Sequence, residues 1–276
     1  MLDLKGKTAL VTGASRGIGR GIAIALAEAG AARVALTYFQ NQAAAAEATE
    51  AARAAGADAI AVRYDQSSPQ DTAEIFRAVR DRFGGLDVFV ANARPDFDHF
   101  FAEPETIAPE LFEHAFAAQA RAFHTEARHA ARVLGPGGRI IAVTYGPGSR
   151  TGSWQPWVAM GSAKAAMESL VRYWAVALAG RGITVNAVSP GLTEGNTAID
   201  SLPADVVAEL RAWARSGWVP MRRLTTPQDV GRAVALLSTG HADFVTGQIL
   251  YVDGGASLMD PSFPLAIQWP GAARHA

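Results

Sequence analysis

Short apolar runs rich in valine and isoleucine recur along the chain, and alanine-rich segments with a helical pattern separate them. Seven runs are found, at Thr8 to Val11, Arg33 to Thr37, Ala59 to Arg63, Val88 to Ala91, Arg139 to Thr144, Ile183 to Val188 and Gln248 to Val252. The helical segments between the first four runs are Ile18 to Ala29, Ala43 to Ala55 and Pro69 to Phe83. Apolar runs of about four to eight residues are typical of buried strands. The alternation predicts an α/β fold of the doubly wound class, with a seven-stranded parallel sheet and helices on both faces.

The length and composition limit the domain organisation. At 276 residues, 49% hydrophobic and 18% charged, the chain has ample apolar material for one large core. We expect a single domain over residues 1–259, followed by a proline-rich C-terminal tail over residues 260–276. The tail, which carries Phe263 and Trp269, either caps a neighbouring subunit or frays, and the sequence leaves both possibilities open.

The charge and the absence of certain residue types exclude several classes of function. A net charge of -1 provides no basic field for nucleic acid or for an anionic membrane surface. The chain has no cysteine, which excludes disulfides, thiolate catalysis and cysteine-based metal sites. Its six histidines are scattered, so no metal site is assigned. With neither a signal-peptide pattern nor a long apolar stretch, the sequence predicts a soluble cytoplasmic protein.

A string of glycines follows the first apolar run and opens the first helical segment. It reads Thr12-Gly13-Ala14-Ser15-Arg16-Gly17-Ile18-Gly19. Glycine lets backbone N–H groups approach a phosphate closely, and the start of a helix adds unpaired donors and a positive dipole. The string therefore predicts a cradle for the pyrophosphate of a dinucleotide. Its predicted contacts are Gly13, Ser15, Arg16, Gly17, Ile18 and Gly19.

The spacing of these glycines, together with Lys164 and with Asp253-Gly254-Gly255, resembles the short-chain dehydrogenase/reductase family over about residues 4 to 258. The resemblance implies a Rossmann fold, a bound nicotinamide cofactor and a homotetramer, with a mobile substrate flap over about residues 192–220. It also implies cofactor contacts outside the glycine string. They are Tyr38, Asp65, Gln66, Asn92, Ala93, Lys164, Pro190, Gly191 and Thr193.

The end of the second predicted strand decides between NAD and NADP. In an NAD-specific site an acidic side chain there accepts a hydrogen bond from the ribose 2′-hydroxyl. Here the segment reads Leu36-Thr37-Tyr38-Phe39-Gln40 and holds no acid. Arg16 in the glycine string can pair with a 2′-phosphate through charge-assisted hydrogen bonds. We therefore expect NADP(H) as the cofactor.

The residues expected to deliver a proton depart from the family pattern. Members that reduce ketones carry a tyrosine four residues before the lysine, a serine at the end of the preceding strand and an asparagine on the preceding helix. Here these positions hold Met160, Tyr145 and Gln119, and the last glycine of the Asn-Asn-Ala-Gly motif is Arg94. A methionine has no proton to give. The departures argue against an ordinary ketoreductase mechanism.

A second branch of the family, the enoyl-acyl-carrier-protein reductases, is similar in a different way. It carries one tyrosine seven residues before the lysine and another at the end of the strand, and Thr144-Tyr145 fits the second of these. Trp157 takes the place of the first. Because Trp157, Met160 and Lys164 share one face of a helix, the indole is expected to point into the site.

These residues make up the predicted active site. The catalytic candidates are Lys164, Tyr145 and Trp157, and the substrate pocket is assigned to Arg94, Trp154, Trp157 and Met160. We expect the indole N–H to donate to an enolate oxygen while Tyr145 or water supplies a proton. Lys164 is expected to bind the nicotinamide ribose and to lower the pKa of a neighbouring phenol. Other roles stay open: packing at the helix start for Trp157, a buried phenol for Tyr145, and an outward or phosphate-directed orientation for Arg94.

The predicted function is an NADP(H)-dependent reductase of an activated C=C bond, in an enoyl thioester or an enone-like substrate. A carbonyl or imine reductase that uses Tyr145 as its proton donor is the alternative among enzymes. An alternative of another class is a nucleotide-binding protein that performs no hydride transfer. The missing tyrosine favours that alternative, whereas the intact Lys164 and the complete glycine string speak against it.

Overall fold

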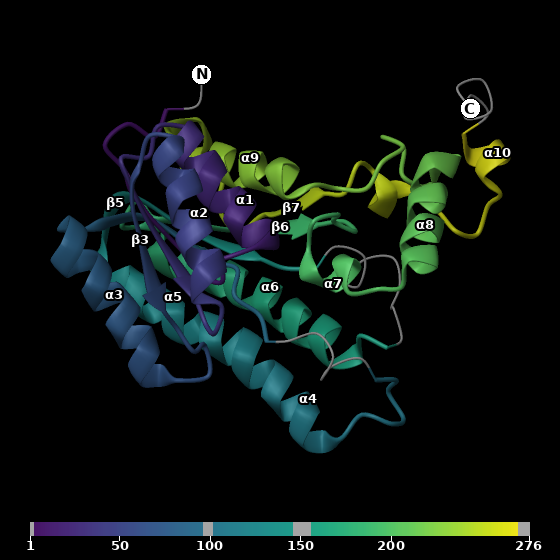
Figure 1. Ribbon diagram of the computed structural model, residues 1–276, viewed down its shortest axis with the longest axis horizontal. Helices are drawn as coiled ribbons and strands as arrows, with labels where there is room; N and C mark the ends of the chain where they lie inside the picture. The colour runs from purple at the N-terminus through teal and green to yellow at the C-terminus, as the bar shows by residue number, and fades with distance from the viewer. Residues whose placement is uncertain (1–2, 96–101, 146–155, 270–276) are drawn as a thin grey trace.

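Seven parallel strands form one sheet at the centre of the protein (Figure 1). The computed structural model describes residues 3–95, 102–145 and 156–269. The strands are β1 (Thr8–Val11), β2 (Arg33–Tyr38), β3 (Asp58–Arg63), β4 (Leu86–Ala91), β5 (Leu134–Val143), β6 (Thr184–Pro190) and β7 (Ile249–Val252). Their order is β3-β2-β1-β4-β5-β6-β7, and every neighbouring pair is parallel. The seven predicted strands are confirmed apart from their end points.

Helices cover both faces of this sheet. One face carries α1 (Gly17–Glu28), α2 (Gln42–Ala54) and α9 (Pro227–Ser238), and the other carries α3 (Pro69–Phe83), α5 (Ala122–Val133) and α6 (Val158–Ala179) (Figure 1). The helix α4 (Pro109–Phe116) continues into α5 through a π-helical turn, Ala117–Arg121. Each face has its own apolar core, built around Ile22 and Val230 on one side and around Ile75 and Phe123 on the other. The doubly wound Rossmann fold is confirmed.

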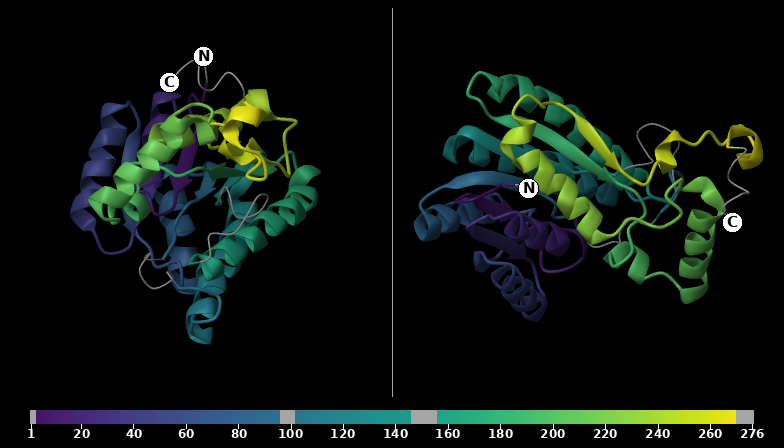
Figure 2. Two further views of the ribbon diagram at one scale, coloured as in Figure 1. Left: turned by 90° about the vertical axis from the view of Figure 1, so that its right-hand side faces the viewer. Right: turned by 90° about the horizontal axis from the view of Figure 1, so that it is seen from above.

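Beyond the carboxyl ends of the strands the chain adds further short helices at one end of the molecule (Figure 2). They are α7 (Thr197–Asp200) and α8 (Ala204–Trp213), within the predicted flap, and α10 (Leu265–Gln268), within the predicted tail. A Cβ placed on Gly217 would lie 3.1 Å from Leu265 and 3.5 Å from Trp269. The Arg222 guanidinium lies over the Trp269 ring, 5.4 Å from its centroid. The described part of the tail therefore packs beside the flap region of its own chain.

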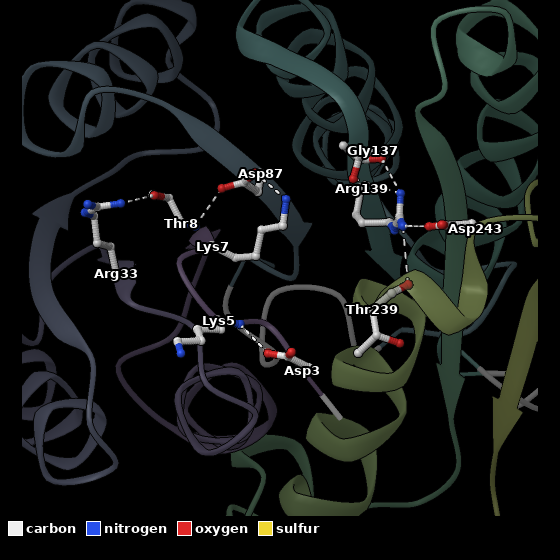
Figure 3. A network of polar contacts seen from close by, with 11 residues as sticks. Asp3, Lys5, Lys7, Thr8, Arg33, Asp87, Gly137, Arg139, Thr239 and Asp243 are labelled. Atoms are coloured by element: carbon white, nitrogen blue, oxygen red, sulfur yellow. Dashed lines mark hydrogen bonds and ion pairs between the residues drawn. The ribbon is translucent and has the colours of Figure 1, made fainter. Parts of the chain in front are cut away.

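At the edge of the sheet where the strands begin, polar contacts join neighbouring segments of the chain (Figure 3). The Asp87 carboxylate accepts a hydrogen bond from Lys7 Nζ and another from the first backbone N–H of β1, each at 2.9 Å, which joins the start of β1 to the start of β4. Arg139 on β5 is 3% exposed. Its guanidinium donates to the Thr239 carbonyl oxygen at 3.3 Å and pairs with Asp243. These contacts fix β5 to the turn that follows α9.

We expect Arg139→Met to lower the free energy of unfolding by about 2 to 3 kcal/mol, because buried carbonyl groups lose a charged donor. Urea unfolding followed by circular dichroism measures the loss. Arg80→Met is the control, since Arg80 pairs with Asp81 on the exposed surface of α3 and such pairs contribute little. Equal stability of the two variants would contradict the role given to Arg139.

Candidate active site

The loops that follow the strands enclose a cleft of about 730 Å³. Every cofactor position predicted from the sequence lines this cleft. They are Gly13, Ser15, Arg16, Gly17, Ile18, Gly19, Tyr38, Asp65, Gln66, Asn92, Ala93, Lys164, Pro190, Gly191 and Thr193. The catalytic candidates Tyr145 and Trp157 line it as well, together with Arg94 and Met160 of the predicted substrate pocket. Trp154, the remaining pocket prediction, lies outside the described residues.

The loop between β1 and α1 approaches the loop after β4 so closely that glycine is required at two positions. Gly13 has a φ of +62°, and a Cβ placed on it would lie 2.7 Å from the Cα of Ala93. A Cβ on Gly19 would overlap the carbonyl oxygen of Gly13 and the side-chain amide of Asn92. The cradle predicted from the glycine string is thus a surface of bare backbone, which a phosphate can approach closely.

Asn92, at the end of β4, clamps this glycine loop. Its Nδ2 donates to the carbonyl oxygens of Thr12 at 2.9 Å and Gly13 at 3.0 Å. In return, the Thr12 hydroxyl oxygen accepts from the backbone N–H groups of Asn92 at 3.0 Å and Ala93 at 3.1 Å. The amide that the sequence assigns to cofactor contact is therefore engaged in holding the cradle in shape.

The start of α1 is open toward the cleft. Its N-cap residue, Arg16, makes no side-chain cap, and the first turn has no acidic residue. The first N–H groups of α1 are therefore available to an anion in the cleft. Nearby, the cleft-lining residues from Thr37 to Asn41 at the end of β2 carry no carboxylate. The backbone N–H groups at the start of α1 can donate to a pyrophosphate. The end of β2, which has no carboxylate to repel an anion, and the nearby Arg16 suit a ribose 2′-phosphate.

An apolar wall faces the cradle across the cleft. Trp157 precedes α6 and is 7% exposed, and its ring centroid lies 6.2 Å from that of Tyr145, at an interplanar angle of 58°. Met160 packs in the same cluster and is 1% exposed. Trp157, Met160 and Lys164 all line the cleft, but Trp157 is the N-cap residue of α6 and lies outside the helix, so the expectation that the three residues share one helix face holds only for Met160 and Lys164. Trp157 combines two roles that the sequence leaves as alternatives, because it packs at the helix start and also lines the site.

Two ionisable side chains in the wall carry perturbed pKa values. Lys164 is 7% exposed, and its Nζ donates to the Val143 carbonyl oxygen at 2.7 Å. Burial, assisted by the positive charge of Arg94, lowers the pKa of Lys164 to about 7. Burial raises the pKa of Tyr145 to about 12, so this phenol keeps its proton at neutral pH. Lys164 is not among the causes of this shift, so a lowering of the phenol pKa by Lys164 stays a prediction for Tyr145.

Gln119 occupies the π-helical turn between α4 and α5, where the family pattern has asparagine. It is 2% exposed, and its Nε2 donates to the carbonyl oxygens of Ala93 at 3.3 Å and Ala118 at 3.0 Å. Its Oε1 is buried and finds no hydrogen-bond partner within the described residues. The Gln119 side chain therefore binds the backbone of the loop after β4, next to the cofactor cleft.

Glu126 on α5 is an acidic residue that the sequence reasoning missed. It is 3% exposed and accepts a hydrogen bond from the hydroxyl of Tyr64 at 2.7 Å. Burial raises the pKa of Glu126 to about 7. A sequence signal existed, because Glu126 interrupts the apolar face that Phe123, Ala127 and Ala130 form at helical spacing.

The described ranges hold neither a cluster of metal ligands nor a membrane span. Among their side chains, no three histidine, aspartate or glutamate residues gather in a way that could hold a metal ion. None of the helices they contain is long and apolar enough to cross a membrane.

Comparison with known proteins gives extensive matches. The family model described as Enoyl-(Acyl carrier protein) reductase matches residues 13–257. Versicolorin reductase 1 of Aspergillus parasiticus is 36% identical over 264 residues, which cover 92% of this chain and 97% of that protein. The 1-cyclohexenylcarbonyl-CoA reductase of Streptomyces collinus is 33% identical over 258 residues, which cover 93% of this chain and 89% of that protein.

Among solved structures, the angucycline C-6 ketoreductase LanV with bound NADP superposes with a TM-score of 0.83 at 35% identity, covering 93% of this chain and 98% of LanV. A short-chain dehydrogenase of Burkholderia cenocepacia in complex with NADP gives a TM-score of 0.80 at 33% identity, covering 92% of this chain and 98% of that chain. Both similar structures thus hold the same cofactor.

We expect Asn92→Asp to lower the free energy of unfolding by about 2 kcal/mol, because the carboxylate faces two carbonyl oxygens where the amide donated to both. Thermal unfolding measures the effect. Asn41→Asp is a matched control, since the Asn41 side chain caps α2 by accepting from the Ala44 N–H and aspartate caps equally well. If both variants unfold at the same temperature as the unmodified protein, Asn92 does not clamp the loop.

Proposed function

The chain belongs to the short-chain dehydrogenase/reductase family, and we propose that it is an NADP(H)-dependent reductase of an activated C=C bond. The substrate is an enoyl thioester or an enone-like molecule, in which a carbonyl group polarises the double bond. Reduction places a hydride on the β carbon and negative charge on the carbonyl oxygen. The site must therefore bind the cofactor, orient an apolar substrate and hold that oxygen.

Several features of the cleft support NADP(H) as the cofactor. The glycine cradle and the open start of α1 suit the pyrophosphate. Arg16 and the carboxylate-free end of β2 suit the 2′-phosphate. Both similar structures described above contain NADP. The cofactor, when bound, supplies the hydride, and the protein supplies the binding surface and the hydrogen-bond donors.

The observation that carries the proposal is the presence of Met160, buried, at the position four residues before Lys164. A ketone that accepts hydride becomes an alkoxide and needs a proton from a nearby acid before it leaves as an alcohol. An enolate needs a hydrogen-bond donor at its oxygen, and water can protonate its carbon. A site that lacks the acid beside its lysine is better suited to the second reaction.

Tyr145 and Trp157 are the residues to which we assign the hydrogen bonds to the substrate oxygen. The Tyr145 hydroxyl keeps its proton because burial raises its pKa to about 12, so it can donate to an enolate oxygen. The Trp157 indole N–H is a donor that is never lost near neutral pH. To Lys164, which lines the same cleft, we assign the hydrogen bonds to the ribose hydroxyls of the cofactor. Met160 and the rings of Tyr145 and Trp157 provide an apolar surface against which the substrate can pack.

A carbonyl reductase is the second candidate. LanV, which is 35% identical to this chain, is named a ketoreductase. The observation in this chain that favours it is the protonated Tyr145 in the cleft, which can give a proton to an alkoxide as well as hold an enolate.

Comparing two thioesters separates the candidates. We expect NADPH oxidation with crotonyl thioester, whose C=C bond is conjugated to the carbonyl, to be at least about tenfold faster than with acetoacetyl thioester, whose ketone is the reducible group. Faster turnover of acetoacetyl thioester would establish the carbonyl reductase instead. Tight NADPH binding without oxidation across enones, ketones and imines would indicate a binding protein.

Replacing the proposed donor tests the mechanism on whichever substrate is turned over. We expect Tyr145→Phe to lower kcat about a hundredfold with little change in NADPH affinity, because only the donor to the developing oxyanion is lost. The matched control is Tyr173→Phe, since Tyr173 lies on α6 with its side chain 74% exposed. Unchanged turnover in Tyr145→Phe would remove Tyr145 from the reaction.

A further inference from the structure

Behind the cleft, a buried hydrogen bond joins the end of β3 to the middle of α5. The Tyr64 hydroxyl donates to Glu126 Oε1 at 2.7 Å, and both residues are 3% exposed. The Thr72 hydroxyl oxygen on α3 lies 3.4 Å from the same Tyr64 oxygen. Burying a carboxyl group is costly unless it is hydrogen-bonded or meets a positive charge. The Tyr64 hydroxyl provides the bond, and the positive charge comes from α6.

The charge that Glu126 meets is Lys164. The inner faces of α5 and α6 belong to one apolar core, to which α5 contributes Phe123 and Ala127 and α6 contributes Met167. Within this core the ammonium of Lys164 acts on the Glu126 carboxyl through space and opposes the rise in its pKa. The structure describes both side chains and shows no direct hydrogen bond between them. The interaction is therefore electrostatic, and it acts through the apolar core that the two helices share.

Opposing influences act on the charge of Lys164. Burial favours the neutral amine, and so does the positive charge of Arg94. The carboxylate of Glu126 favours the ammonium, and that of Glu168, one helical turn along α6, acts in the same sense. The carbonyl oxygen of Val143, which accepts from Nζ, also favours the ammonium. With the pKa of Lys164 at about 7, removing one of these influences changes the charge present at neutral pH.

Glu126 itself depends on its partners. Burial raises its pKa to about 7, whereas the hydrogen bond from Tyr64 and the charge of Lys164 both favour its carboxylate form. Burial, assisted by the negative charge of Glu126, raises the pKa of the Tyr64 phenol, so Tyr64 stays a donor. A carboxylate that is fixed by Tyr64 thus stabilises the ammonium, and the ammonium stabilises the carboxylate.

We propose that Glu126, fixed by Tyr64, is a positioning residue that keeps Lys164 in its ammonium form for binding the cofactor ribose. Glu126 touches neither the cleft nor the reacting atoms, and it acts through Lys164. Tyr64, which donates to this buried carboxylate, and Lys164 both line the cleft. The inference rests on the part of the proposed function that assigns Lys164 to NADP(H), and it holds for reduction of either a C=C or a C=O bond.

The dissociation constant of NADPH as a function of pH tests this role without any substrate. In the unmodified protein, loss of the Lys164 proton raises the dissociation constant as the pH increases through about 7. In Glu126→Gln the ammonium loses a stabilising charge, so the pKa of Lys164 falls. The pH at which binding weakens should therefore move downward by about one unit. Titration of the cofactor's own phosphate is common to all variants and does not affect the comparison.

Five further variants, one of them a double variant, give the test its controls. Lys164→Met should abolish this pH dependence, and adding Glu126→Gln to it should have no further effect on the profile. Glu168→Gln should move the midpoint in the same direction but by less, because Glu168 acts more weakly on Lys164 than Glu126 does. Glu74→Gln, at an exposed carboxylate paired with Arg77, should leave the midpoint in place. Tyr64→Phe keeps the carboxylate but removes its hydrogen bond, so it should also move the midpoint downward, and it replaces Glu126→Gln if that variant does not fold.

A purely structural role for Glu126 would weaken NADPH binding equally at every pH and leave the midpoint unchanged. That result in Glu126→Gln, or in Tyr64→Phe if the former does not fold, would overturn the proposal. It would leave the proposed reductase activity intact, since that activity is judged by turnover of the two thioesters. Conversely, absence of turnover with a shifted binding midpoint would support the role of Glu126 and count against the reductase.

Discussion

The contact between the loop after β1 and the loop after β4 sets the geometry of the whole cleft. Parallel strands bring these loops to the same edge of the sheet, and Asn92 then binds the backbone of the glycine loop at two carbonyl oxygens. Gly13 lies so near Ala93 that no side chain fits between them. Gln119 donates a hydrogen bond to the backbone of the same loop after β4, and Arg94 in this loop lines the cleft. The position of the cradle and that of the loop that carries Arg94 therefore depend on one another.

Much of the fold and of the cofactor half could be predicted from the sequence because local patterns determine them. Valine-rich runs between helical segments specify buried parallel strands, and a glycine string between a strand and a helix specifies a phosphate cradle. The pair formed by Tyr64 and Glu126 could not be predicted in this way. These residues are 62 positions apart in the chain, and only the packing of α5 beside the end of β3 brings them together. The pKa of Tyr145 likewise follows from burial, which the spacing of residues does not reveal.

The chemistry of the wall follows from what each side chain can do with a proton. The Met160 side chain has no proton to donate. Tyr145 stays protonated because its pKa is raised to about 12, whereas Lys164, with a pKa of about 7, titrates near neutral pH. In the mechanism that we propose, a phenol at the end of β5 and an indole at the start of α6 take the place of the family's usual proton donor. In the same proposed mechanism Lys164, with its charge stabilised by Glu126, chiefly binds the cofactor. Such a division of roles suits a reaction in which an oxyanion is stabilised by hydrogen bonding rather than neutralised by a strong acid.

A crystal structure of the protein with NADP and a conjugated enone bound together tests the central claim most directly, which is that the donor to the substrate oxygen has moved to Tyr145. The account predicts that the Tyr145 hydroxyl lies within about 2.6 to 3.2 Å of the enone oxygen, with Met160 alongside the carbon chain. An enone oxygen held by Arg94, with the Tyr145 hydroxyl beyond hydrogen-bond reach, would contradict it.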